Sequence, residues 1–169
     1  MDGAAGSAQH LDRGPRDRTL EQGRIVLLKS LTQACEIGVR RGGGSRMIME
    51  EFIRSGVRKT HVMVDPWGDI PYLATDTDAV MPTDYTNEMR SQFFTEIGIW
   101  SQGKNVNPVV INATDDEFFK RYGDYVQTYV DKQIVNEEFY CVVHLDGPHA
   151  PVPVNKEVDF FAPRIDRKS

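Results

Sequence analysis

Apolar positions near the start of the chain follow a helical spacing. Apolar side chains recur every three or four positions across residues 19–40, and Thr19 with Gln22 has the spacing of a capping box. The triple glycine at 42–44 is typical of a helix end. We therefore expect a helix over 19–40 and a second, shorter helix over 45–54.

A third helical pattern lies in the second half of the chain. Thr114 and Glu117 form another capping box, and the intervening acidic residues suit the positive end of a helix dipole. Aromatic residues follow at helical spacing, which predicts a helix from 114 to about 132.

The remaining apolar segments are short and alternate, which is typical of strands. The clearest alternation lies over 91–100, where Phe93 and Ile97 share a face and both faces carry apolar groups. The other predicted strands cover residues 60–64, 70–74, 109–111, 139–145 and 152–161.

Together these elements predict an α+β fold. We expect N-terminal helices packed on a small, largely antiparallel sheet or partly open barrel, with one inserted helix. The expected organisation is a flexible tail over 1–18, one domain over 19–163 and a polar tail over 164–169.

Composition supports a single soluble domain. The chain has 169 residues, of which 40% are hydrophobic, and it contains no apolar run near the roughly 20 residues that span a bilayer. Its two cysteines, Cys35 and Cys141, provide no disulfide framework. We therefore expect a cytoplasmic location, no membrane contact and no secretory signal.

The net charge of −5 is unevenly distributed. Residues 19–60 carry eight basic and four acidic groups, net +4, whereas 65–90 carry six acidic groups against Arg90, net −5. The acidic total argues against a dedicated nucleic-acid binder. Opposed segments of this kind are typical of a protein that contacts other proteins or further copies of itself.

Motifs for chemistry are sparse. The glycines at 42–44 lack the lysine and hydroxyl residue of a phosphate-binding loop. His144, Asp146 and His149 cluster around a turn, where a metal site competes with an ordinary solvated turn as the interpretation. We expect no cofactor and no resident metal, and the chain is expected not to be an enzyme.

Two parts of the chain resemble the stringent starvation protein B family, adaptors that deliver tagged substrates to the ClpXP protease. The resemblance is carried by Thr60–Asp65, Val80–Tyr85 and Phe93–Ile99, and then by Glu138–Pro148, Pro151–Val154 and Phe160–Phe161. It implies a small barrel with a peptide-binding groove, whose lining would be Val64, Met81, Phe94, Ile97, Tyr140 and Val142. Pairing through the first helix would use Leu27, Leu28, Leu31 and Cys35.

The leading functional hypothesis is therefore a non-enzymatic adaptor. It would bind a peptide segment or protein surface through strand or groove recognition, form a dimer or other homo-oligomer, and take part in proteolysis. Two alternatives remain open: a structural subunit of a larger assembly, such as a virion or organelle complex, and a metal-dependent enzyme.

Overall fold

The computed structural model describes residues 33–68, 72–73, 80–81, 86–130, 132–147 and 150–165, which mix helices and strands as the α+β prediction required. The strands are β1 (Gln33–Ile37), β2 (Thr60–Val64), β3 (Tyr72–Leu73), β4 (Val80–Met81), β5 (Asn107–Ile111), β6 (Val126–Val130), β7 (Gln133–Glu137) and β8 (Tyr140–Leu145). The helices are α2 (Gly43–Ser55), α3 (Asn87–Ser101), α4 (Asp115–Arg121), α5 (Pro151–Phe161) and the short 3-10 helix η1 (Ala162–Arg164).

The main sheet has four strands in the order β5-β2-β1-β8. All three pairings within it are parallel, so the expectation of a largely antiparallel sheet is wrong for this sheet. Antiparallel pairing occurs in two small ribbons, β3 with β4 and β6 with β7. Parallel neighbours need crossover connections, and helices provide them here.

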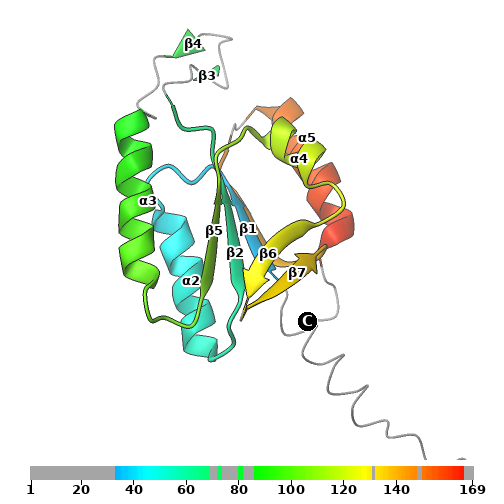
Figure 1. The fold of residues 1–169 in the computed structure, drawn as a ribbon. Coiled ribbons are helices and arrows are strands. Elements are labelled where there is room, and N and C mark those ends of the chain that lie inside the picture. The colour runs from blue at the N-terminus through cyan, green and yellow to red at the C-terminus, as the bar shows by residue number, and fades with distance from the viewer. Residues whose placement is uncertain are drawn as a thin grey trace, which may run out of the picture.

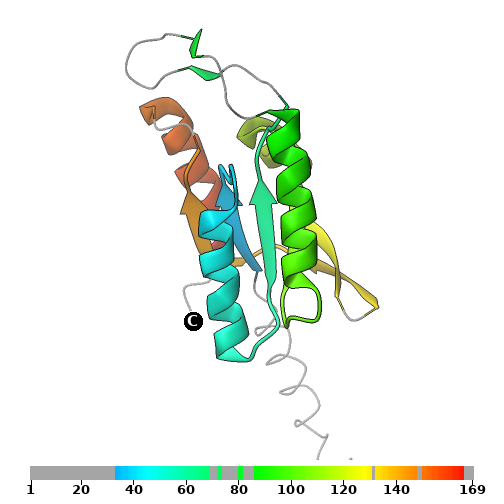
Figure 2. The ribbon, with the colours of Figure 1, turned by 90° about the vertical axis from the view of Figure 1, so that its left-hand side faces the viewer.

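The helices cover both faces of the sheet (Figures 1 and 2). On one face α2 and α3 bury Met49, Phe52 and Phe93 against the strands. On the other face α4 and α5 bury Phe118 and Phe161. The sheet is thus the middle of three layers, which explains why all residues of β1 and β2 are buried.

The order of the strands reverses beside β1. The chain proceeds outward from β1 to β2 and β5, and then returns across the sheet to place β8 on the other side of β1. A doubly wound sheet opens a crevice at such a switch point, outside the carboxyl ends of the strands. In this chain the switch point lies between β1 and β8.

Two segments differ in kind from the prediction. Residues 33–37 form the central strand β1, although they fall at the end of the predicted helix over 19–40. Residues 91–100 belong to helix α3, because Thr86 caps its first turn and Met89, Phe93 and Ile97 bury one face at four-residue spacing. The apolar residues of 91–100 also alternate, which is why the sequence pattern predicted a strand there.

Two further segments differ in extent or type. Helix α4 begins at its predicted capping box but ends at Arg121, and 126–130 form strand β6. Residues 152–161 form helix α5 instead of a strand, since Pro151 occupies its first turn, where proline costs no hydrogen bond. The predictions over 45–54, 60–64, 109–111 and 139–145 are confirmed, and β3 covers part of 70–74.

Two buried carboxyl groups make the stability of the fold dependent on pH. Burial raises the pKa of both Glu137 and Glu157 from 4.5 to about 7. Between these values the folded chain holds protons that the unfolded chain has released, so the free energy of unfolding should fall as pH rises from about 5 to 8. Glu157→Gln should flatten this fall and stabilise the fold by on the order of 1–2 kcal/mol at pH 8 but not at pH 5.

Urea unfolding across this pH range measures the effect. The matched control is Glu138→Gln, which removes an exposed carboxylate beside Glu137 and should leave the profile unchanged. An identical pH profile for Glu157→Gln and the unchanged chain would contradict the prediction.

Candidate functional site

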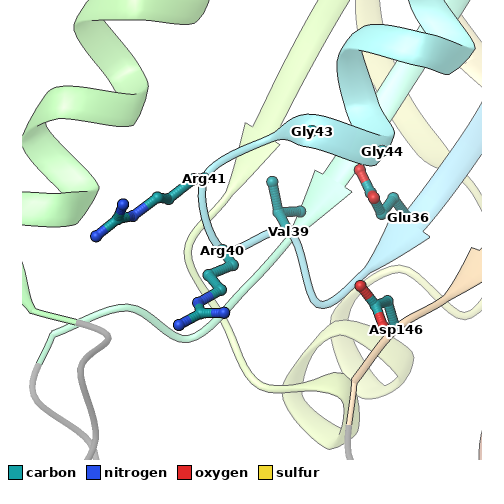
Figure 3. A pocket seen from close by; sticks show the side chains of 7 residues that line it. All are labelled: Glu36, Val39, Arg40, Arg41, Gly43, Gly44 and Asp146. Carbon is teal, nitrogen blue, oxygen red and sulfur yellow. The ribbon is translucent and has the colours of Figure 1, made fainter.

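The loop from β1 to α2 borders a hollow of about 350 Å³ at the switch point. Its lining is Glu36, Val39, Arg40, Arg41, Gly43, Gly44 and Asp146. Figure 3 shows Glu36 and Asp146 projecting from β1 and the end of β8 on one side, while Arg40 and Arg41 extend from the loop on the other. The hollow therefore has an acidic wall and a basic rim.

The loop needs glycine at its first position. Gly38 has φ +82°, and a Cβ there would overlap the backbone of Asp146. The close approach is fixed by two hydrogen bonds, because Gly38 N–H donates to Val64 O (2.9 Å) and Asp146 N–H donates to Ile37 O (2.8 Å). The ends of β1, β2 and β8 are thereby joined to one another.

Side chains that follow β2 hold the same loop. Asp65 is 1% exposed, and its Oδ2 accepts hydrogen bonds from the backbone N–H groups of Val39 and Arg40, each at 2.8 Å. Burial raises the pKa of Asp65, and these two bonds partly oppose the rise. Trp67 Nε1–H donates to Arg40 O at 2.9 Å, and its ring stacks on Phe93.

A buried polar network lies under the acidic wall. Glu36 is 1% exposed; its Oε2 accepts a hydrogen bond from Ser45 Oγ, and its Oε1 lies 2.9 Å from His144 Nδ1. His61 Nε2 is 3.6 Å from Oε2. Burial alone would raise the pKa of Glu36, but His61, Ser45 and His144 outweigh it and lower that pKa, so the group is a carboxylate at neutral pH.

Comparison with known proteins does not assign a family or a function to this chain. Comparison with protein-family models, with curated proteins and with solved structures finds no match for this chain. The geometry of the hollow and its network is therefore the basis for assigning a function.

The described residues expected to line a peptide groove are divided between the two faces of the sheet. Val64 and Tyr140 are buried under α4 and α5, whereas Ile97 is buried on the opposite face of the sheet. Phe94 and Val142 are about two-fifths exposed, on α3 and on β8. Met81 lies in β4, and its side chain falls outside the described residues.

Of the residues expected to mediate self-association, only Cys35 lies within the described ranges. Cys35 is fully buried in the central strand, so a second copy has no access to it. Leu27, Leu28 and Leu31 lie outside the described residues.

The metal hypothesis is not supported by the part of the chain that the structure describes. There, no three histidine, cysteine or acidic side chains are grouped to hold an ion. His144 faces Glu36, Asp146 lines the hollow, and His149 lies outside the described ranges. Within the same ranges, no helix is long and apolar enough to cross a bilayer.

Sequence analysis missed Glu36, which lines the hollow, and Gly38 and Asp65, which shape the adjoining loop. Their signal was present, because Gly38 and the glycines at 42–44 separate a short apolar segment from a helix. Asp65 follows 21 positions after Gly44, close to the spacing of the acidic residue in nucleotide-binding βαβ units. A helix assigned over 19–40 concealed this strand–loop–helix unit.

Proposed function

We propose that this chain binds S-adenosylmethionine in the hollow at the switch point and uses it as a methyl donor. The observation that carries the proposal is the position of the hollow, at the carboxyl ends of β1 and β8 and against a glycine-rich loop. Open parallel sheets bind nucleotide-type ligands at this position. A volume of about 350 Å³ is within the range of small-molecule sites.

The charges around the hollow favour this cofactor over a phosphate-bearing one. The chain lacks both glycine motifs that cradle phosphates, the G-x-G-x-x-G fingerprint and the G-x-x-x-x-G-K-[ST] loop. Glu36 and Asp146 would repel phosphates and attract the sulfonium and ammonium groups of S-adenosylmethionine. Arg41, which also lines the hollow, could pair with the carboxylate of the same ligand.

Calorimetric titration tests the proposal. S-adenosylmethionine and S-adenosylhomocysteine should bind with a dissociation constant on the order of 10 µM, and NAD and ATP should bind far more weakly. Asp146→Asn should weaken binding of S-adenosylmethionine about tenfold, equivalent to about 1.4 kcal/mol. Asp159→Asn removes an exposed carboxylate on α5 and is the charge-matched control.

Two outcomes would contradict this assignment. One is the absence of binding by either adenosyl compound to the folded chain. The other is tighter binding of NAD or ATP, which would point to a phosphate site.

The peptide-binding adaptor is a second candidate, favoured by one observation. Among the described residues, β8 pairs with β1 on one side and makes a single bridge, Tyr140 to Ile165, outside the four-stranded sheet. An extended peptide or a second copy would add to such an edge through backbone hydrogen bonds. A partner captured by the chain but not by Val142→Lys, which places a charge on this edge, would support it.

A further inference from the structure

His144 is presented differently from the other described histidine. His61 is fully buried, whereas the side chain of His144 is 44% exposed on the edge strand β8. Its Nδ1 lies 2.9 Å from Glu36 Oε1. A carboxylate only accepts hydrogen bonds, so Nδ1 must carry the proton and Nε2 of the neutral ring has its lone pair available.

The ring of His144 lies beside the hollow. A Cβ on Gly44, which lines the hollow, would meet His144 Cε1 and Nδ1 at 3.1 Å. Glu36 connects His144 with the hollow, since Glu36 lines the hollow and pairs with His144. Asp146 is two positions further along the chain, at the end of the same strand.

The groups around His144 come from each neighbouring element. Glu36 on β1 faces His144 Nδ1 through one carboxylate oxygen. Ser45 on α2 donates a hydrogen bond to the other oxygen, and His61 Nε2 on β2 lies 3.6 Å from it. Asp146 adds a second negative group, and Arg40 and Arg41 provide the opposing positive charge across the hollow. A carboxylate that orients an imidazole and fixes its tautomer leaves the other ring nitrogen free to act as a general base.

We propose that His144, positioned by Glu36, is the general base that accepts the proton of the methyl acceptor. This inference rests on the proposed methyl-donor function. The acceptor is a hydroxyl or similar group that must lose a proton: its heteroatom bonds the methyl carbon as the sulfonium–carbon bond breaks. The sulfur keeps the electron pair and becomes a neutral thioether, and the proton moves to His144 Nε2.

Chemical modification and NMR test the inference without a known acceptor. Calorimetry with S-adenosylhomocysteine first establishes whether the hollow binds an adenosyl ligand. Diethyl pyrocarbonate then modifies the accessible histidines, with sites mapped by mass spectrometry. At ligand ten times above its dissociation constant, modification of His144 should slow about tenfold, because about one site in ten remains free.

Nitrogen-15 NMR measures the tautomer. The neutral ring of His144 should carry its proton on Nδ1, and Glu36→Gln should remove this preference. Ser45→Ala is the matched control, because it deletes a partner of Glu36 Oε2 and leaves the contact with His144 intact. Should Glu36→Gln fail to fold, the tautomer of the unchanged chain and the reactivity of His144 decide the question.

The outcomes separate the two proposals. Failure of S-adenosylhomocysteine to bind overturns both. Binding without any change in the reactivity of His144, or a proton on Nε2 of its neutral ring, overturns the general base and leaves the cofactor site standing. His144→Asn should retain ligand affinity, whereas a threefold or larger loss would show that the ring holds the cofactor instead.

Discussion

Replacing Gly44 with alanine should destabilise the fold by about 3 kcal/mol and abolish ligand binding. A Cβ at Gly44 would overlap Glu36 Oε1, which has no free space because its side chain is buried and bonded to Ser45 and His144. To admit the methyl group the carboxylate must move, which breaks hydrogen bonds to a buried charge. Urea unfolding and calorimetry measure the two effects.

Gly43→Ala is the matched control for stability. Gly43 also lies in the first turn of α2, but a Cβ there would meet nothing within 4 Å. Alanine is the better helix former, so the free energy of unfolding should stay the same or rise by up to about 1 kcal/mol. If both variants lower the free energy of unfolding equally, the loss comes from replacing a flexible glycine and not from overlap with Glu36.

A double-mutant cycle isolates the steric cause. In a Glu36→Ala background the carboxylate is absent, so adding Gly44→Ala should lower the free energy of unfolding only slightly further. Additive costs would mean that Gly44 and Glu36 act independently, which contradicts the overlap.

The class of the fold and several elements followed from local pattern alone. The capping box at Thr114 and Glu117 has the predicted hydrogen bonds, and β2 lies where its apolar alternation placed it. Both signals involve neighbouring residues, and they specify local structure irrespective of the rest of the chain. The α+β mixture is confirmed for the same reason.

The direction of the sheet depends on contacts that local pattern does not contain. Phe93 and Ile97 share one side of a strand and also one side of a helix, and only the packing of α3 on the sheet decides between them. With α3 taken as a strand and β1 as a helix, no helical crossovers remained between strands. An antiparallel sheet was then the consistent inference, although a mistaken one.

The candidate site was hidden for a related reason. Glu36 and His144 are 108 positions apart and become partners because β8 returns beside β1. Their pairing follows from the strand order, which requires both crossovers to be known. Asp65 similarly acquires its role from the loop between β1 and α2, whose N–H groups it binds, and Gly44 acquires its role from its contact with Glu36.

The anchoring of that loop gives the second large expected effect. Asp65 is the acceptor for two backbone N–H groups, those of Val39 and Arg40, and Arg40 has a left-handed backbone with φ 51°. A residue other than glycine occupies that region at a cost of about 1 kcal/mol or more. The two hydrogen bonds, with the bond from Trp67 to Arg40 O, offset this strain and fix the wall of the hollow.

Asp65→Ala should therefore destabilise the fold by about 3 kcal/mol and open the loop, since it leaves a cavity and two N–H donors without their acceptor. Asp65→Asn keeps an oxygen in place and relieves the cost of a buried charge, so it should cost about 1 kcal/mol. Urea unfolding measures both values, and hydrogen exchange at Val39 and Arg40 should accelerate strongly in the alanine variant alone. Equal exchange rates in the alanine variant and the unchanged chain would mean that another group holds the loop, and the hollow would then survive without Asp65.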